Sequence, residues 1–503
     1  MAGLLRQDLR RPRQMTRRMT PEVSTDGSAL PQSPPPSSPP AAALRAWRAS
    51  KRPWVRRVVL TVLVLCLAAG AGLVSGPLAA LDVGSRRPDG YGDLAAAPSR
   101  GALLAARLWP SWAASPSGAF PVYRPRGSAT DASVTSALST GYRGWSPAPP
   151  PAVLAPSPQF AGKPSPLGDE ARAIYLTGYT AGQPAAFRYL IELIDSTALN
   201  ALVVNIKDEQ GKATYDTQVP AFRDAGAISI QIHDMQEFLT LTRAYGIYTI
   251  ARLVTFEDST MTYHNPDLAV KRKDGSVWRD AAGNAWLDPF LPEAWDYVLS
   301  LAEEAAGLGF DEIQFDYVRF PTDGDVRNAV FSQPDGPDCV NRVRAITEFL
   351  NYARGRLAPY GTKTSADVFG IICSTSVDTA LGQVLEDVAG AVDYLSPMIY
   401  PSHYGPRHFG LDEPDAQPYE TIRGALSDAL RRLGPEGKAK LRPWLQDFTL
   451  YHTYGPEQVL DQIRATHELG VKGWMLWNPS NRYTTAAIYA YTVDLDAYLS
   501  GGP

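Results

Sequence analysis

Carboxylates stand near the ends of several short apolar runs in the carboxy-terminal two thirds of the chain. Asp316, Asp367 and Asp447 each lie near the end of such a run, and Asp208 directly follows another. Two carboxyl groups that meet in one site can divide an acid–base reaction, because one can attack or stabilise an electron-poor carbon while the other delivers a proton. A folded domain has no structural need for carboxylates at these positions, so they are the first candidates for chemistry.

The elements that must position these residues begin at about residue 171. Runs rich in Val, Ile, Tyr and Phe alternate with helical patterns, and the pattern at 456–470 begins with Pro and ends with Gly, as helix termini prefer. Eight strands, each followed by a helix, predict a (β/α)8 TIM barrel with insertions. An open doubly wound sheet is the alternative, weakened because no glycine-rich phosphate turn follows the first strand. The predicted strands are 173–178, 201–207, 247–256, 311–320, 364–370, 392–400, 442–448 and 473–478.

A barrel would bring the carboxylates together. The loops that follow the strands converge at one face of a TIM barrel, where the chemistry is placed. Side chains alternate along a strand, so Gln314 and Asp316 share one face while Ile313 and Phe315 point under the helices. The acidic ends of the fourth, fifth and seventh strands are therefore expected to meet at one mouth.

The first third of the chain has a different composition. Residues 1–57 carry 12 Lys and Arg against three acidic residues, and we expect a disordered cytoplasmic tail. Residues 58–81 contain no charge and, as a helix, are long enough to cross a hydrocarbon core of about 30 Å. The basic flank predicts a single-pass signal anchor in the cell membrane, with the amino terminus cytoplasmic and the barrel extracytoplasmic. A cleaved signal peptide is the alternative.

The rest of the chain is a linker and the barrel. Residues 82–170 are rich in Ala, Pro, Ser and Gly and predict an extended, disordered linker, and residues 171–500 form the barrel domain. Because the chain as a whole has a net charge of −4 and its first 57 residues are basic, the remainder is strongly acidic. An acidic body argues against nucleic acid as a partner.

The cysteines and histidines exclude some classes of site. Six scattered His and three Cys rule out a zinc array and a disulfide-dense scaffold, and no HExxH or H-x-H motif occurs, so we expect no metal and no cofactor. Cys66 lies in the apolar segment. Cys339 and Cys373 follow adjacent strands, and outside the cytoplasm they could form a disulfide; two separate buried thiols are the alternative.

Five segments of the predicted barrel resemble those of a known family. In the same order, and over roughly residues 171–500, they resemble a bacterial family of unknown function that is classed with barrel-fold glycoside hydrolases. The resemblance implies a carbohydrate-active barrel, distantly similar to the alpha-amylase-type and alpha-galactosidase-type hydrolases. The segments are NIKDEQG (205–211), ARLVTFED (251–258), GFDEIQFDYVRFP (309–321), SPMIYPSHY (396–404) and RPWLQDF (442–448).

The resemblance also implies roles for the carboxylates. In those hydrolases an Asp at the end of the fourth strand is the nucleophile, which matches Asp316. The amylase type has acidic residues after strands five and seven, which match Asp367, the expected general acid, and Asp447. Two departures are Gln314, where the amylase type has Arg, and Asp367 itself, where Glu is usual. The alternatives are a structural ion pair of Asp316 with Arg319 or Arg252 and a helix-capping role for Asp367.

A second group of residues is expected to bind the substrate. Its acidic members would bind hydroxyl groups or cap loops, and its cations would hold the carboxylates ionised. Its aromatic members would stack on sugar rings or belong to the core, and its histidine is a loop residue at the mouth. The long connection 257–292 is expected to form a lid or a wall of the site. The predicted substrate-binding residues are Asp447, Asp208, Lys207, Arg252, Gln314, Tyr400, His403 and Trp477.

Together these features predict a membrane-anchored glycoside hydrolase that acts outside the cytoplasm on a cell-envelope or exported polysaccharide. Retention requires the two carboxyl groups to lie about 5–5.5 Å apart, and inversion about 6.5–9.5 Å. The main alternative is a non-catalytic glycan-binding barrel, in which Asp316 would be locked in a salt bridge with no open carboxylate partner. A metal-assisted hydrolase of acyl or phosphoryl groups is a third hypothesis.

Overall fold

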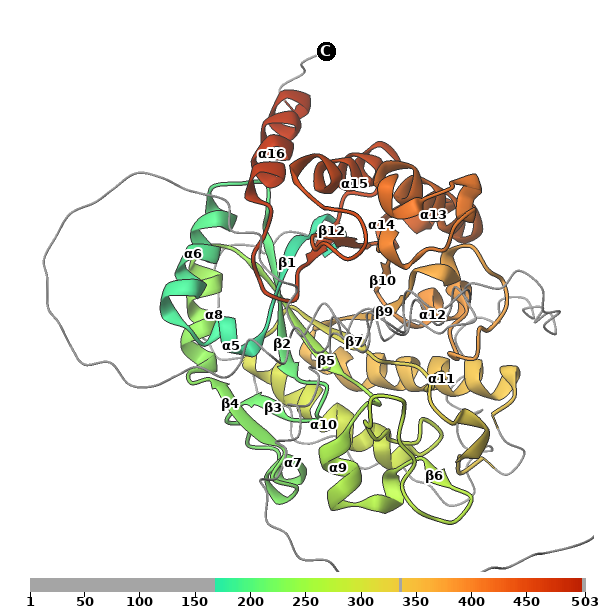
Figure 1. Cartoon of the computed structure of the whole chain (residues 1–503). Coiled ribbons are helices and arrows are strands. Elements are labelled where there is room, and N and C mark those ends of the chain that lie inside the picture. The colour runs from blue at the N-terminus through green and yellow to red at the C-terminus, as the bar shows by residue number, and fades with distance from the viewer. Residues whose placement is uncertain (1–167, 334–336, 500–503) are drawn as a thin grey trace, which may run out of the picture. The chain divides into compact units, whose positions relative to one another are not determined.

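A closed sheet organises the part of the chain that the computed structural model describes, residues 168–333 and 337–499. Eight parallel strands follow one another in the order β1–β12–β11–β10–β9–β7–β5–β2, and the pairing of β1 with β2 closes the barrel (Figure 1). The predicted (β/α)8 barrel is therefore confirmed, and the open sheet is excluded. The barrel strands are β1 (Arg172–Leu176), β2 (Ala201–Lys207), β5 (Tyr248–Val254), β7 (Glu312–Asp316), β9 (Lys363–Phe369), β10 (Tyr394–Met398), β11 (Trp444–Gln446) and β12 (Trp474–Trp477).

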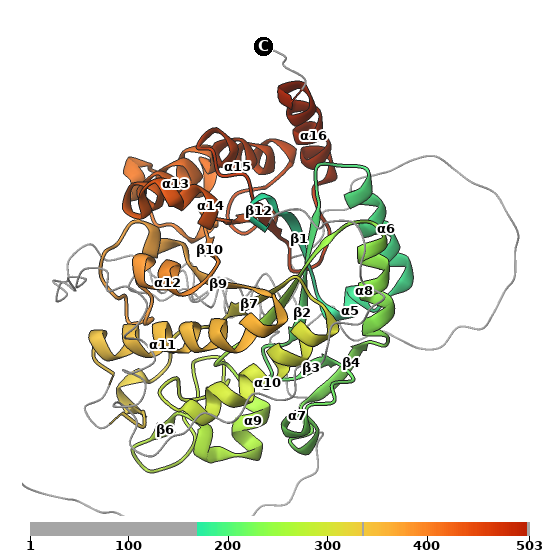
Figure 2. The same ribbon diagram turned by 180° about the vertical axis from the view of Figure 1, so that it is seen from behind.

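A helix follows every barrel strand, and the helices surround the sheet in both views (Figures 1 and 2). Several of these helices begin with proline, which has no N–H to leave unsatisfied in the first turn; α15, for example, starts at Pro456 as its sequence pattern predicts. The helices are α6 (Pro184–Asp195), α8 (Met235–Ala244), α10 (Pro292–Leu308), α11 (Cys339–Leu357), α12 (Leu385–Ala391), α13 (Pro418–Leu433), α15 (Pro456–Glu468) and α16 (Thr485–Leu499).

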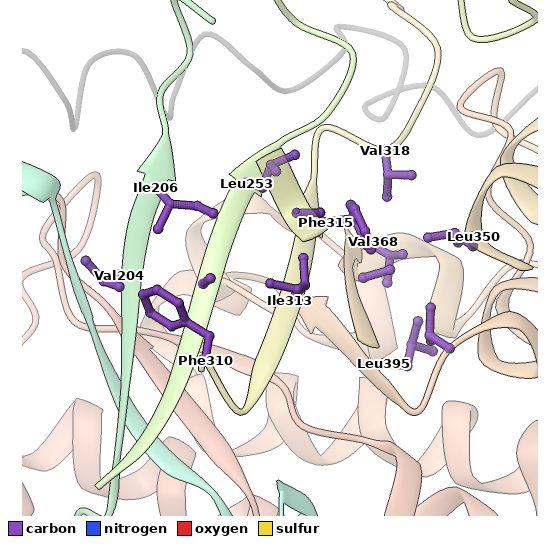
Figure 3. Close-up of a cluster of buried hydrophobic side chains, with 14 of the residues drawn as sticks. Val204, Ile206, Leu253, Phe310, Ile313, Phe315, Val318, Leu350, Val368 and Leu395 are labelled. Atoms are coloured by element: carbon purple, nitrogen blue, oxygen red, sulfur yellow. The ribbon is translucent and has the colours of Figure 1, made fainter. Parts of the chain in front are cut away.

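The main hydrophobic core lies between the strands and the helices. Ile313 and Phe315 of β7 pack there with Leu253 of β5 (Figure 3), as the alternation along the strand predicts. The Phe315 ring meets Phe349 of α11 edge-on, with 5.4 Å between ring centroids. Burying side chains of this size stabilises the fold by about 1.5–3 kcal/mol each, and the residues between them on β7 are consequently turned into the barrel.

A buried ion pair forms the floor of the barrel. Glu312 of β7 and Arg442, which precedes β11, are both fully buried, and two guanidinium nitrogens of Arg442 donate to the two carboxylate oxygens. The Tyr248 hydroxyl donates to the same carboxylate at 3.0 Å. Gln314 lies one inward position above Glu312 and donates to the Ser396 hydroxyl at 3.3 Å, so its side chain is fully buried beneath the mouth.

Insertions enlarge the mouth on one side. Three short elements follow β2: β3 (Ala213–Tyr215), α7 (Pro220–Asp224) and β4 (Ile228–Ile232). The connection after β5 contains α9 (Ser259–His264), β6 (Lys271–Arg272) and several isolated β-bridges, so it is an ordered wall of short pairings. The sequence pattern did not predict β3 or β4, which belong to the insertion after β2 and not to the strand–helix repeat of the barrel.

Two expectations about other parts of the chain have different outcomes. The predicted disulfide between Cys339 and Cys373 was wrong, because both thiols are free. The alternative of two separate buried thiols holds for Cys373, which lies in the core, but not for Cys339, which starts α11 and is partly exposed. The predicted tail, membrane anchor and linker, as well as Cys66, lie outside the described residues. Within the described ranges, no helix has the length and apolar character needed to cross a membrane.

Candidate active site

The centre of the barrel mouth is an ion pair between Asp316 and Arg252. Asp316 is the last residue of β7, and its Oδ2 accepts hydrogen bonds from Nε and Nη2 of Arg252 at 2.9 and 2.5 Å. Its Oδ1 accepts from the backbone N–H of Tyr317 at 2.7 Å. The side chain keeps a small exposed fraction, 9%. Charge-assisted bonds of this kind favour the ionised carboxylate.

Asp367 of β9 is the second carboxyl group at this place, and its environment is the opposite. It is 2% exposed, and its Oδ1 accepts a hydrogen bond from Trp444 Nε1 at 2.7 Å. Burial raises the pKa of Asp367 well above its usual range, and the negative charge of Asp316 raises it further, against the weaker opposing effect of Arg252. This environment favours a protonated carboxyl group beside an ionised one.

The register of the sheet places the two carboxyl groups side by side. Phe315 of β7 pairs with Ala366 of β9, so the next residues, Asp316 and Asp367, occupy neighbouring positions on adjacent strands. Adjacent strands lie about 4.8 Å apart. The predicted meeting of the acidic ends of the fourth and fifth strands is therefore present in the fold.

Aromatic rings surround the pair. Tyr175 of β1 stacks on Trp477 of β12 with 4.1 Å between centroids, and the Arg252 guanidinium lies over the Trp477 ring at 5.3 Å. Trp444 meets Trp477 edge-on at 5.5 Å. Tyr400 is buried, which is the main cause of its raised pKa, and the charges of Asp367 and Asp316 act on it in the same direction. Two of the predicted aromatic binding residues, Tyr400 and Trp477, thus lie at the pair.

Glu209 adds a third carboxylate that the sequence did not single out. It follows β2 in the same turn as Asp208, and its Oε1 lies 3.2 Å from Nη1 of Arg252. Asp208 instead accepts the backbone N–H groups of Gln210 and Lys212, so it caps the turn. Asp208 and Glu209 both follow β2, and only the direction of the turn brings Glu209 to Arg252. The sequence does not show that direction.

Lys207 does not join Arg252 at the carboxylate pair. Its ammonium group forms a fully buried ion pair with Asp258 at 2.9 Å and donates to the Val254 carbonyl. A register shift between Asn205 and Lys207 places Lys207 beside Leu253, whose side chain faces the helices. The lysine consequently ties β2 to the segment after β5.

Two other predicted residues have local partners. Both carboxylate oxygens of Asp447 accept from Thr484, one from its N–H at 2.8 Å and one from its hydroxyl at 2.6 Å, so Asp447 holds the residue that precedes α16. Burial raises the pKa of Asp447 to about 6. His403 packs against the rings of Tyr400 and Phe448, and burial lowers its pKa to about 4.

No group of three or more His, Cys, Asp or Glu side chains is arranged to hold a metal ion within residues 168–333 and 337–499. The carboxylates of the mouth are instead engaged by arginine, lysine, tryptophan and backbone donors. A closed barrel with two neighbouring carboxyl groups in contrasting environments at its mouth is an arrangement that glycoside hydrolysis requires.

Comparison with known proteins identifies the family. Residues 173–483 match the model of a family described as "Putative glycosyl hydrolase domain". The match covers more than half of the chain, and the chain belongs to this family. A comparison with curated proteins finds no match.

Solved structures are similar to parts of the chain. A hypothetical protein from Ruminiclostridium thermocellum is 38% identical, with 39% of this chain and 97% of that chain covered and a TM-score of 0.36. The glycoside hydrolase domain of PgaB (BpsB) from Bordetella bronchiseptica is 15% identical, with 65% and 97% covered and a TM-score of 0.48. An alpha-galactosidase from Thermus thermophilus is 15% identical, with 67% and 63% covered and a TM-score of 0.40.

Proposed function

We propose that this chain is a membrane-anchored, extracytoplasmic glycoside hydrolase that cleaves a cell-envelope or exported polysaccharide with retention of anomeric configuration. One observation carries the proposal: Asp316 and Asp367 hold neighbouring positions on adjacent strands, and one is paired with an arginine while the other is buried with a raised pKa. The family to which the chain belongs supports hydrolysis of a glycosidic bond.

Each carboxyl group has one role in the proposed mechanism. Asp316 attacks the anomeric carbon as the Asp367 proton passes to the leaving oxygen, which breaks the glycosidic bond and forms a glycosyl–Asp316 ester. Asp367, now ionised, takes a proton from water, and the resulting hydroxide oxygen displaces Asp316. Asp316 regains its negative charge, Asp367 regains its proton, and one water is consumed.

The surroundings of each carboxyl group suit its role. Two nitrogens of Arg252 donate to Oδ2 of Asp316, which fixes the orientation of the carboxylate for attack. The hydrogen bond from Trp444 to Oδ1 of Asp367 leaves its other oxygen to carry the proton. The placement of the pair on adjacent strands favours the short separation that retention needs over the wider gap that inversion needs.

Polymer cleavage outside the cytoplasm is supported by the amino-terminal sequence. The uncharged segment 58–81 with its basic flank would anchor the chain in the membrane, and the linker 82–170 would hold the barrel away from it. Tyr400 and Trp477 would contact sugar rings beside the carboxyl pair, and Glu209 would accept a hydroxyl group.

The experiment compares the full-length chain with Asp316→Asn on a panel of purified bacterial envelope and exported polysaccharides. We expect new reducing ends with the wild type and a loss of about 10³-fold or more in the variant, as for other covalent nucleophiles. Asp267→Asn, which changes a carboxylate whose side chain is 99% exposed and that pairs with Lys271 on the surface, is the matched control. NMR of the first-formed product tests retention. Equal activity of the wild type and Asp316→Asn would remove Asp316 as the nucleophile.

A glycan-binding barrel is the second candidate. The observation in its favour is the Asp316–Arg252 ion pair, because a salt bridge at Asp316 is expected of a barrel that binds glycans without cleaving them. A binding barrel would retain a glycan on the wild type without releasing reducing ends. The same panel separates the two functions when bound and cleaved polymer are both measured.

A further inference from the structure

Glu257 is a buried carboxyl group that the proposed mechanism does not use. It lies just after β5, and its side chain is 1% exposed. Its Oε1 accepts a hydrogen bond from Asn284 Nδ2 at 2.7 Å, whereas its Oε2 has no hydrogen-bond partner among the described residues. A buried polar atom without a partner costs about 1–3 kcal/mol, so such atoms are kept where a ligand completes them.

The surroundings of Glu257, burial above all, favour its neutral form. Burial raises the pKa of Glu257 to about 8; Arg319 opposes this effect, and Asp280, Glu209 and Asp323 add to it. Glu257 forms no ion pair with Arg319 in the described part of the chain. At neutral pH the carboxyl group therefore carries a proton, and a carboxylic O–H without an acceptor can donate to an oxygen atom from outside the protein.

Asp280 is not the partner of Oε2 of Glu257 in the described part of the chain, and its own oxygens bind other donors. Its Oδ1 accepts from the backbone N–H groups of Ala282 and Asn284, both at 2.9 Å, and its Oδ2 accepts from Trp286 Nε1 at 3.0 Å. These bonds shape the turn that carries Asn284 onto Glu257. The wall formed by the connection after β5 thus fixes one oxygen of Glu257 and leaves the other unpaired.

Arg319 connects Glu257 with the carboxyl pair. Its guanidinium lies 5.3 Å from the ring of Tyr317, 5.1 Å from that of Phe369 and 4.7 Å from that of Trp286, and the side chain is 6% exposed. Tyr317 directly follows Asp316, and Phe369 is two residues beyond Asp367. The arginine is therefore held by rings that neighbour both members of the pair.

The backbone at Tyr317 supports a functional role for this side of the mouth. Its φ of +51° lies in the left-handed region, which is unfavourable for an aromatic residue and costs about 1–3 kcal/mol. The same conformation lets its N–H donate to Asp316 and brings its ring to Trp286, with 6.0 Å between centroids. Strain of this kind is retained where it positions functional groups.

We propose that Glu257, Arg319 and Tyr317 form a subsite that binds an uncharged sugar unit beside Asp316 and Asp367, with the protonated Glu257 donating a hydrogen bond to a sugar oxygen. The proposal rests on the proposed function, because it names part of the substrate of that site. Asp280, Asp323 and Glu209 oppose a carboxylate on the sugar at this position, and Arg319 opposes an ammonium group. A neutral sugar offers acceptors to both Glu257 and Arg319 without either repulsion.

The test measures binding of the full-length chain to an array of defined oligosaccharides that carry neutral, carboxylate-bearing or amine-bearing units, at pH 7 and pH 9.5. With a pKa of about 8 at Glu257, the protonated fraction falls about 30-fold between these pH values, and we expect wild-type binding to neutral glycans to fall by a similar factor. Glu257→Gln keeps an uncharged donor, so it should bind within about threefold of the wild type at pH 7 and lose the pH dependence. Glu257→Ala should bind at least about tenfold more weakly at pH 7.

Glu420→Gln, at an exposed position of α13, is the control and should follow the wild type at both pH values. Unchanged pH dependence in Glu257→Gln, preference for charged glycans, or absence of any binding at pH 7 would overturn the subsite. The proposed hydrolysis is tested by a different measurement, because binding does not require bond cleavage. Equal turnover by the wild type and Asp316→Asn would contradict hydrolysis by Asp316 and would leave the binding results for the subsite unaffected.

Discussion

Asp316 and Asp367 are the same residue type on adjacent strands, yet their neighbours give them different chemistry. Arg252 donates two bonds to Asp316, whereas Asp367 receives one bond from a neutral indole and feels the charge of Asp316. Two like charges this close cannot both be stable in a buried site, so one arginine is enough to decide which carboxyl group keeps the proton.

Replacing Asp367, the proposed proton donor, should make the rate of hydrolysis depend on the leaving group. In Asp367→Asn we expect hydrolysis of the natural polymer to fall by about 10²–10⁴, because its alcohol leaving group needs protonation. An activated dinitrophenyl glycoside of the same sugar needs no proton, so its first step should be much less affected. Values of kcat/KM on both substrates report the first step and check this, and an equal loss of kcat/KM on both would contradict the acid role of Asp367.

The buried pair of Lys207 and Asp258 makes a prediction about stability. Lys207→Met leaves Asp258 as an unpaired buried charge, which costs about 3–5 kcal/mol in comparable cases. Urea unfolding monitored by circular dichroism measures the change, and Lys207→Met combined with Asp258→Asn should recover part of it. A change below about 1 kcal/mol in the single variant would mean that the pair is hydrated.

Some of these residue contacts follow from the sequence and others do not. Alternation along β7 correctly separates Asp316 and Gln314 from Ile313 and Phe315. The same alternation fails for Lys207, because a register shift in β2 turns it toward a different neighbour. A one-residue irregularity in a strand leaves no mark on hydrophobic periodicity.

Among the elements, the short turn after β2 carries unusual constraints. Gly211 has a φ of +87°, and a Cβ atom there would lie 1.9 Å from Oδ1 of Asp258. That aspartate also caps α9 by accepting the N–H of Met261 at 2.7 Å. The turn, the cap and the Lys207 ion pair therefore form one unit that joins β2 to the wall of the mouth.

Gly211→Ala should disrupt this unit. The positive φ alone costs about 1 kcal/mol for alanine, and the collision with Asp258 adds to it. Gly226→Ala is the matched control, since Gly226 has a φ of +61° and no atom within 4 Å of the added Cβ. Urea unfolding should show a clearly larger loss for Gly211→Ala. Equal losses in the two variants would show that the turn moves aside.

Among the strands and helices, the sequence predicts those of the barrel repeat and misses those in the insertions after β2 and β5. The eight strands and the helix α15 have the lengths and periods expected of a barrel. The pairings after β5 depend on contacts between distant residues, such as Glu257 with Trp286, which no local pattern encodes. The predicted disulfide fails for a related reason: sequence places two cysteines on adjacent loops but does not give their depth.

The molecule as a whole carries buried carboxyl groups whose pKa values are raised, so its stability depends on pH. The pKa of Glu257 is about 8 and that of Asp447 about 6 in the folded state, against ordinary values near 4 in the unfolded chain. Between these values the folded state holds protons that the unfolded state has lost. The stabilisation is complete below about pH 4 and is lost as the pH rises through 6 and then 8.

The free energy of unfolding should therefore fall with rising pH, by at most about 1.4 kcal/mol per pH unit for each proton held. Glu257→Gln should remove the contribution of Glu257 to this slope, which extends from about pH 4 to 8, and should equal the wild type more closely at low pH. Urea titrations at a series of pH values measure both chains. Parallel profiles would show that Glu257 is ionised in the folded barrel at neutral pH.

Closure of the sheet between its first and last strands has a consequence for biosynthesis. The Tyr175–Trp477 stack that supports Arg252 joins residues about three hundred positions apart, and β1 pairs with β12. A nascent chain on the ribosome therefore lacks a finished catalytic mouth until the final strand has been made and delivered. Any fragment released early, or cleaved ahead of that strand, should lack hydrolytic activity.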